Sequence, residues 1–173
     1  LMDGARSLWP DNIHQYSGLL LSLRHAQGRL AEAIEFFERE YRAFVAHYEI
    51  QPPQLFARIQ FLWLDAQSGR TDRALAEFEA ISEDGWAALQ HAGYFWLGCV
   101  ALLPEACAVL GDDTQALALE GLLLPYGERI MLGGNAGTFL KPGWYYLGLL
   151  AATRSDWTKA EQYFSAALAM TER

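Results

Sequence analysis

The sequence has few of the features that mark proteins which bind nucleic acid or lack a fold. Only two of its 173 residues are lysine, and 13 basic against 21 acidic side chains give a formal net charge of −8. Direct nucleic-acid binding uses many clustered cations that displace phosphate counterions, so this composition argues against it. Charged residues make up 20% of the chain and hydrophobic residues 52%, a balance that excludes intrinsic disorder.

Long apolar runs and export signals are also missing. The longest segments without a charged residue or a histidine, 92–104 and 142–153, have 13 and 12 residues, whereas a membrane-spanning helix needs about 20. No basic segment leads into an apolar core near the start, so we expect no signal peptide. Because the first residue is Leu1, we expect the chain to be a piece of a longer polypeptide.

Cysteine is scarce as well. Cys99 and Cys107 are eight residues apart in one apolar segment, which corresponds to about 12 Å along a helix and is too far for a disulfide. We expect both to be buried, reduced thiols. Together with the absence of a membrane or export signal, this predicts a cytoplasmic protein.

A short pattern recurs four times at spacings of 41, 42 and 44 residues: a small residue, then arginine or aspartate, three variable residues and alanine. Its copies are Gly28–Ala33, Gly69–Ala74, Gly111–Ala116 and Ser155–Ala160. Each copy separates two segments of helical periodicity, so the pattern predicts a helix–turn–helix. The glycine ends the first helix in the left-handed conformation, an aspartate such as Asp112 or Asp156 caps the second, and the alanine lets the two helices approach closely.

The periodicity predicts an all-α fold of four antiparallel helix pairs and no strand. Helices are expected near 12–27, 30–49, 53–68, 71–82, 90–110, 113–125, 143–154 and 157–172. They form repeats near 12–49, 53–82, 90–125 and 143–172 of a single domain that covers residues 1–173. We expect this domain to be a right-handed α-α superhelix of about four helix pairs. Pro104 lies inside one predicted helix, which we expect to kink there.

The last copy resembles a tetratricopeptide repeat. The residues that match its spacing are Trp144, Leu147, Gly148, Ala151, Ala160, Phe164 and Ala167, with Ala151 where the family usually has tyrosine. The other copies depart from the pattern: Leu21, Leu62 and Pro104 occupy the small-residue position, and Glu120 replaces an aromatic residue. The period is also longer than the family's 34 residues. The resemblance therefore implies tetratricopeptide-like repeats with lengthened helices.

A narrower resemblance covers residues 50–173. Its motifs are Leu103–Asp112, Leu122–Tyr126, the pair Gly133 and Gly134, and Tyr146–Ala151. In this order and spacing they are similar to a helical-repeat region of large bacterial regulators. Those proteins carry an AAA/STAND-type ATPase domain before the repeats and a LuxR-type DNA-binding or nucleotide-cyclase domain elsewhere. The resemblance implies a sensor or scaffold segment, since this sequence has neither a Gly-x-x-x-x-Gly-Lys-Ser/Thr loop nor a basic recognition helix.

Patterns typical of cofactors and catalysis are weak. The glycine-rich stretch Gly127–Gly137 lacks the Lys-Ser/Thr of a phosphate-binding loop, and we interpret it as a long connection able to close over one end of a groove. His14, His25, His47 and His91 show no metal-ligand spacing, and no Gly-x-Ser-x-Gly elbow occurs. We therefore expect no metal, no cofactor and no enzymatic activity.

The first helices of the pairs carry the candidate binding residues. In tetratricopeptide arrays these helices line an inner groove, and the repeat register places nine residues there: Ser22, His25, Phe56, Ile59, Trp63, Ala101, Glu105, Tyr145 and Leu149. Such a face suits an apolar or ring-shaped ligand, or a partner helix, better than an acidic peptide. A competing interpretation is that Phe56 and Trp63 only pack against neighbouring helices. Both lysines, Lys141 and Lys159, lie outside this register, which argues against a carboxylate clamp.

Three functions remain open. The leading hypothesis is a non-catalytic protein-interaction or sensor domain of a cytoplasmic bacterial signalling or transcriptional regulator. Its partner would be a protein, a peptide or the flanking domains of the same chain. The alternative is a small-molecule effector-binding domain that switches an attached module, which predicts a partly enclosed pocket lined by Trp63 and Tyr145. A third possibility is a spacer that packs on adjoining domains through an exposed apolar patch.

Overall fold

A computed structural model describes residues 12–42, 51–133 and 138–172, which form a helical fold with one small β-hairpin. The helices and strands in chain order are α2 (Asn12–Ala26), α3 (Leu30–Phe36) with the π-turn η1 (Phe37–Tyr41), α5 (Gln51–Gln67), α6 (Thr71–Ser82), α7 (Trp96–Leu110), α8 (Asp113–Leu123), β1 (Ile130–Gly133), β2 (Thr138–Pro142), α9 (Gly143–Thr153) and α10 (Trp157–Thr171). The predicted all-α class is confirmed.

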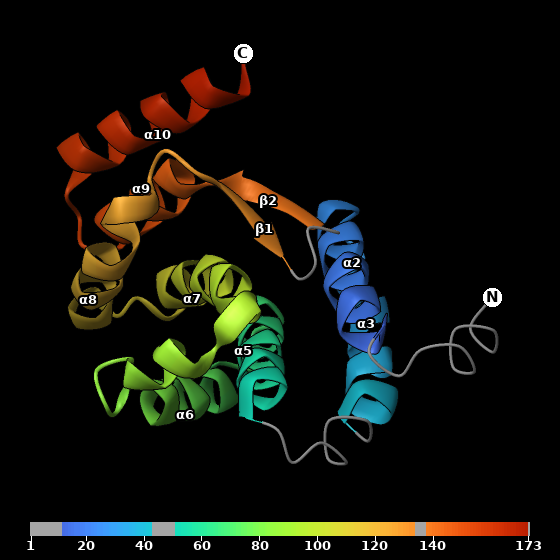
Figure 1. Ribbon diagram of the computed structural model, residues 1–173. Coiled ribbons are helices and arrows are strands. Elements are labelled where there is room, and N and C mark those ends of the chain that lie inside the picture. Colours follow the sequence, from blue (N-terminus) through green and yellow to red (C-terminus); the bar gives the residue numbers. More distant parts are fainter. Residues whose placement is uncertain (1–11, 43–50, 134–137, 173) are drawn as a thin grey trace.

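Consecutive helices pack as pairs, and the pairs follow one another in an arc (Figure 1). The pairs are α2–α3, α5–α6, α7–α8 and α9–α10. The first helices of the last three pairs, α5, α7 and α9, also pack against one another in that order. The hairpin β1–β2 precedes α9 and extends back to α2, so that a segment near the end of the chain lies beside its first described helix.

The turns within the four pairs have one backbone geometry. Gly28, Gly69 and Gly111 have φ angles of 67°, 75° and 72°. Glycine adopts this left-handed conformation without the steric cost that a Cβ imposes. In the fourth copy Ser155 takes it too, at φ 58°. The prediction that this residue ends the first helix of each pair is confirmed.

The caps and the alanines of the pattern are also confirmed. The Asp112 carboxylate accepts a hydrogen bond from the Gln115 N–H at 2.9 Å, and that of Asp156 accepts one from the Lys159 N–H at 3.2 Å. These bonds satisfy amide groups that have no partner within the first turn of α8 and α10. The alanine that closes the pattern is buried in every copy, at Ala33, Ala74, Ala116 and Ala160.

The core consists of two hydrophobic clusters that meet at α5. The larger one contains side chains of α5 to α9, with Leu62, Leu103 and Leu119 fully buried. The smaller one joins α2, α3 and the π-turn to the opposite face of α5, where Trp63 is buried. Apolar burial of this extent supplies most of the free energy that opposes chain entropy. Helix α5 therefore connects the first pair to the rest of the fold.

Helix α7 is the central helix of the larger cluster. Among the described residues one stretch, Gly93–Leu110, is long and apolar enough to cross a membrane, with a mean hydropathy of 1.6, and half of it is buried inside the protein. It begins as a 3₁₀ turn, Gly93–Phe95, and becomes α-helical only at Trp96, later than predicted. The α-helix then runs without interruption through Pro104, which is itself buried.

The prediction that no segment is a strand is wrong. Strands β1 and β2 pair antiparallel, with Leu132 opposite Phe139 and Gly133 opposite Thr138. Each strand is only four or five residues long, and apolar runs of that length show neither helical nor strand periodicity clearly. Residues 134–137, part of the glycine-rich stretch, lie outside the described residues, as do residues 43–49 of the second predicted helix.

The aromatic residues of α10 differ in burial. Trp157, the first residue of the helix, is 68% exposed, whereas Phe164 is half-buried and packs against Gly148 of α9. Tyr163 of the same helix stacks on Trp144 of α9. Phe164 and Tyr163 therefore both contribute to the contact between α9 and α10.

Candidate functional site

A polar cluster joins four elements, α5, α7, β2 and α9. It consists of Trp63 on α5, Glu105 on α7, Lys141 on β2 and Tyr145 on α9, and we call it the Glu105 cluster. The indole N–H of Trp63 donates to Glu105 Oε2 at 2.8 Å, and Lys141 Nζ donates to Glu105 Oε1 at 3.0 Å. Each carboxylate oxygen thus has its own donor, and three helices and the hairpin meet at one side chain.

The lysine of the cluster is held at both ends. Its ammonium group donates to the Tyr145 hydroxyl at 3.1 Å and lies 4.2 Å from the centre of the same ring, within the range of a cation–π contact. Its backbone N–H donates to the Tyr146 hydroxyl at 3.2 Å. Burial lowers the pKa of Lys141, but the Glu105 carboxylate and the Tyr145 hydroxyl outweigh it, so the pKa is above its ordinary value. The side chain is therefore cationic at neutral pH.

Burial differs between the two partners of this ion pair. The side chain of Glu105 is 12% exposed and that of Lys141 is 44% exposed. The carboxylate is thus part of the protein interior, fixed by the Trp63 indole, whereas the ammonium reaches it from the solvent side. A carboxylate so enclosed needs a cation or hydrogen-bond donors to offset its desolvation.

Four of the seven main predicted site residues lie together. Besides Trp63, Glu105 and Tyr145, His25 of α2 is included, because its ring meets the Trp63 indole edge-on with centroids 5.0 Å apart. His25 is exposed to solvent, in contrast to Trp63. Side chains from all four predicted repeats therefore lie close together, as the repeat register predicts for these four residues.

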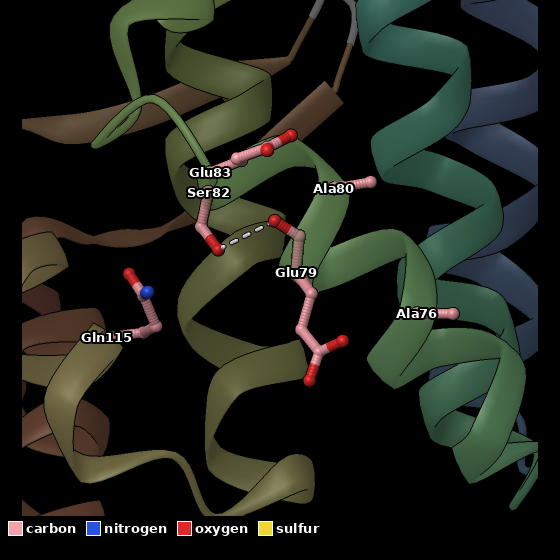
Figure 2. A pocket seen from close by; sticks show the side chains of 6 residues that line it. All are labelled: Ala76, Glu79, Ala80, Ser82, Glu83 and Gln115. Atoms are coloured by element: carbon pink, nitrogen blue, oxygen red, sulfur yellow. Dashed lines mark hydrogen bonds between the residues drawn. The ribbon is translucent and has the colours of Figure 1, made fainter.

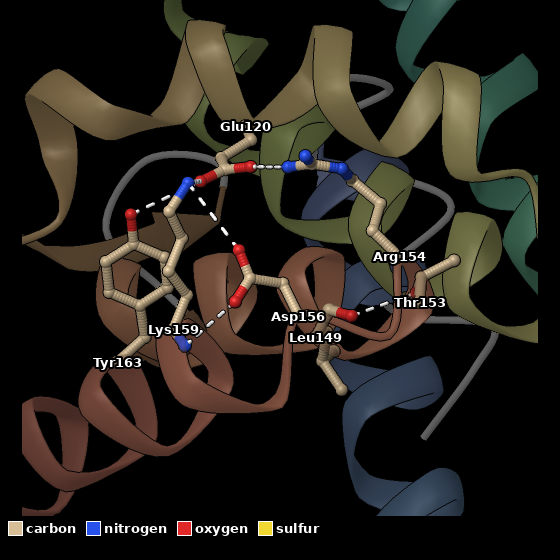
Figure 3. A network of polar contacts seen from close by, with 7 residues as sticks. All are labelled: Glu120, Leu149, Thr153, Arg154, Asp156, Lys159 and Tyr163. Carbon is tan, nitrogen blue, oxygen red and sulfur yellow. Dashed lines mark hydrogen bonds and ion pairs between the residues drawn. The ribbon is translucent and has the colours of Figure 1, made fainter.

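Phe56, Ile59 and Leu149 do not join this cluster. Phe56 is buried and stacks on Phe95 with centroids 4.8 Å apart, and Ile59 is fully buried in the larger core. These two residues were expected to face a groove, and the structure instead places both in the larger core. Leu149 is half-buried against the core, and its carbonyl accepts a bond from Thr153 (Figure 3).

Of the two remaining groove candidates, Ala101 is buried in the larger core and Ser22 is half-buried on α2. Neither is part of the Glu105 cluster as defined above.

The sequence predicts Lys141 outside the helical register, and the structure places it on strand β2 with its ammonium group against Glu105 and Tyr145. The register was derived from helices, whereas Lys141 reaches the cluster from a strand that was not predicted. A signal was present in the sequence, because Lys141 is the only charged residue between Arg129 and Arg154. A lone charge in an apolar stretch of that length requires a partner of opposite sign.

A second polar network surrounds Glu120, a buried residue of α8 (Figure 3). Its carboxylate accepts a hydrogen bond from Arg154 and further bonds from the Tyr163 hydroxyl at 3.3 Å and Lys159 Nζ at 3.5 Å. Burial and the nearby Glu120 charge raise the pKa of Tyr163. Glu120 occupies the position at which other repeats have an aromatic residue. Its ion pairs with Arg154, in the turn after α9, and with Lys159 of α10 therefore take the place of an aromatic packing contact. Its surroundings are complete without a ligand.

A cavity in the described part of the chain lies elsewhere, between α6 and α8 (Figure 2). It is an open depression of about 490 Å³ lined by Ala76, Glu79, Ala80, Ser82, Glu83 and Gln115. The Ser82 hydroxyl bonds to the Glu79 carbonyl at its wall. This depression contains neither Trp63 nor Tyr145, so it is not the enclosed pocket that a small-molecule effector domain would have.

The histidines and cysteines of the described residues form no metal site, and the two cysteines are not exposed nucleophiles. In residues 12–42, 51–133 and 138–172 no three histidine, cysteine, aspartate or glutamate side chains gather as metal ligands. His91 is exposed, and His47 and the side chain of His14 lie outside the described part. Cys99 and Cys107 are buried free thiols, as predicted, and burial raises the pKa of each to about 12.

The Glu105 cluster is therefore the site best suited to recognition: an enclosed carboxylate and aromatic rings, set on three packed helices and covered by a lysine. No protein-family model, curated protein or solved structure matches this chain.

Proposed function

We propose that this chain is a right-handed superhelical domain of tetratricopeptide-like helix pairs that binds a protein partner through its inner face. In this proposal it is a non-catalytic sensor or interaction segment of a larger cytoplasmic bacterial regulator of the AAA/STAND ATPase class. One observation carries the proposal. The first helices α5, α7 and α9 pack side by side, and each contributes one side chain to the Glu105 cluster.

The geometry of the repeats supports the same proposal. Helix–turn–helix units that share turn, cap and buried alanine stack on their neighbours and leave one helix of each unit on a common face. A face assembled from several units is suited to an extended partner, because contacts from successive helices add along its length. The thiols, which would be the strongest nucleophiles of the chain, are protonated and buried, and this supports a binding role rather than thiol chemistry.

The proposal is tested by site-specific photocrosslinking. His25 is exposed and touches the Trp63 ring, so p-benzoylphenylalanine at position 25 samples the inner face without disturbing Glu105 or Lys141. The matched control is the same amino acid at the exposed Asp72 on α6, a second helix of its pair. After irradiation in the native cell, we expect one crosslinked partner at position 25 and none of that mass at position 72. The same products at both positions would contradict an inner binding face.

A further inference from the structure

The Glu105 cluster has the composition of a site for an organic cation. A carboxylate and a tyrosine hydroxyl accept two hydrogen bonds from one ammonium group, and the ring of that tyrosine lies 4.2 Å from the nitrogen. Charge-assisted bonds and a ring face together give more selectivity for a cation than either does alone. In the structure the cation is the protein's own Lys141.

The receptor side and the occupant come from different parts of the fold. Trp63, Glu105 and Tyr145 are on helices α5, α7 and α9, which pack against one another in the larger core and hold the carboxylate in place. Lys141 is on β2, an extended strand of a two-stranded hairpin. The hairpin packs on α2, α7 and α9, but the Lys141 side chain is a flexible chain of methylenes and is 44% exposed, so its ammonium group can leave while the helices keep the site formed.

Exposure and charge favour replacement of this lysine by another. The Lys141 side chain is 44% exposed, so a second ammonium group can approach from solvent, and the Glu105 carboxylate behind it is 12% exposed. The net charge of −8 attracts cationic segments toward the protein. We propose that the Glu105 cluster is a binding site for a lysine side chain of the partner protein, and that Lys141 occupies it as an internal competitor in the free protein.

This inference rests on the proposed function, because it names the chemistry of the partner at the same face. The strand that carries Lys141 indicates the form of the partner: a lysine in an extended segment that reaches Glu105 on α7 and Tyr145 on α9. In the free protein Lys141 lowers the apparent affinity of the Glu105 cluster for the partner's lysine, because only the fraction of molecules with an empty site can bind it. A partner whose lysine binds the Glu105 cluster more tightly than Lys141 displaces Lys141.

The test uses a peptide that copies β2, acetyl-Thr-Phe-Leu-Lys-Pro-amide with a fluorescent label, and a second peptide with norleucine in place of lysine. Binding by anisotropy is measured for the full chain, for Lys141→Ala and for Lys141→Ala combined with Glu105→Gln. The control variant is Lys159→Ala, which removes the other lysine, whose contacts are with Glu120 and Asp156. The indole N–H signal of Trp63, followed by NMR, reports where the peptide binds.

We expect the lysine peptide to bind Lys141→Ala at least about tenfold more tightly than the unmodified chain, the factor for a site that Lys141 fills nine-tenths of the time. Lys159→Ala binds like the unmodified chain. The norleucine peptide and the Glu105→Gln double variant show at least tenfold weaker binding, and only the lysine peptide shifts the Trp63 signal. If Lys141→Ala loses helical structure, the lysine peptide restores its circular-dichroism signal and the norleucine peptide does not.

Equal affinity for the two peptides, or binding that survives Glu105→Gln, overturns the inference. A partner crosslinked at position 25 together with no preference for the lysine peptide removes this inference and leaves the proposed function. Lysine-dependent peptide binding without any partner crosslinked at position 25 keeps this inference about the Glu105 cluster and removes the proposed function.

Discussion

The close contact between α9 and α10 gives a prediction that can be calculated from the structure. A Cβ on Gly148 would lie 2.6 Å from two atoms of the Phe164 ring, so Gly148→Ala forces the ring away from α9. The matched control is Gly121→Ala in α8, where an added Cβ meets no atom within 4 Å. Both glycines lie within helices, so the gain in helix propensity is the same for the two substitutions.

Two effects of different sign set the magnitude. Replacing a helical glycine with alanine stabilises a helix by about 1 kcal/mol. Overpacking a filled contact costs about 1–3 kcal/mol, and the ring has to move by several tenths of an ångström because Cβ contacts below 3.0 Å do not occur. We expect Gly121→Ala to raise the free energy of unfolding by up to about 1 kcal/mol. Gly148→Ala should lower it by about 0–2 kcal/mol.

Urea unfolding followed by far-ultraviolet circular dichroism measures both values. The informative quantity is the difference between the two variants, about 1–3 kcal/mol, because helix propensity cancels from it. Adding Phe164→Leu to Gly148→Ala provides the space for the new methyl group and should make the cost of Gly148→Ala smaller in that background. If the two single variants were equally stabilised, Phe164 would not lie against α9 as described, and the packing of the last pair would need revision.

Three further predictions concern the repeats and the core. Ala160→Leu should lower the free energy of unfolding by about 1–3 kcal/mol in urea melts, because Ala160 is 3% exposed and the larger side chain has no room. The control, Glu161→Leu at the exposed neighbouring position, should change the free energy of unfolding by less than about 0.5 kcal/mol. Equal costs for the two variants would refute the assignment of the buried face. Asp112→Ala should cost about 1 kcal/mol and leave the far-ultraviolet spectrum unchanged, because it removes the cap of α8. The Cys99 and Cys107 thiols should resist a disulfide reagent at about pH 8 until urea unfolds the chain, and fast reaction in the native state would contradict their burial. The pKa of each thiol is about 12 in the fold and about 8.5 when unfolded. In urea melts, the contribution of these thiols to the free energy of unfolding should be constant below about pH 8.5 and should fall as the pH rises toward 12, since the unfolded chain releases these protons first.

The parts of the fold predicted correctly from the sequence are those set by local chemistry. A glycine followed by an aspartate ends one helix and starts the next through bonds within a few residues, and Gly111 with Asp112 does so as expected. Burial of the two cysteines also follows from the apolar segment around them. Such features depend on neighbours in the chain, so one sequence is sufficient to find them.

The parts that were missed depend on contacts between distant residues. The hairpin was not predicted, because four- and five-residue strands have no clear period and their pairing involves residues across a connection. Lys141 was assigned outside the site for the same reason, although it bonds to Glu105 36 residues earlier. On α5 the sequence could not distinguish Phe56, which faces the core, from Trp63, which reaches the site, because both are aromatic and, seven residues apart, lie on the same helical face.

The contact of β2 with α2 changes how this protein should fold. In a linear array each unit touches only its neighbours, so the ends fray and the middle unfolds last. Here the hairpin ties a segment beside the last pair to the first helix, which turns an open arc into a closed path. Contacts between residues so far apart in the chain slow folding, since a long loop must close before they form. Once formed, they join the hairpin to the first described helix, and we expect these two parts of the fold to unfold together in one cooperative step.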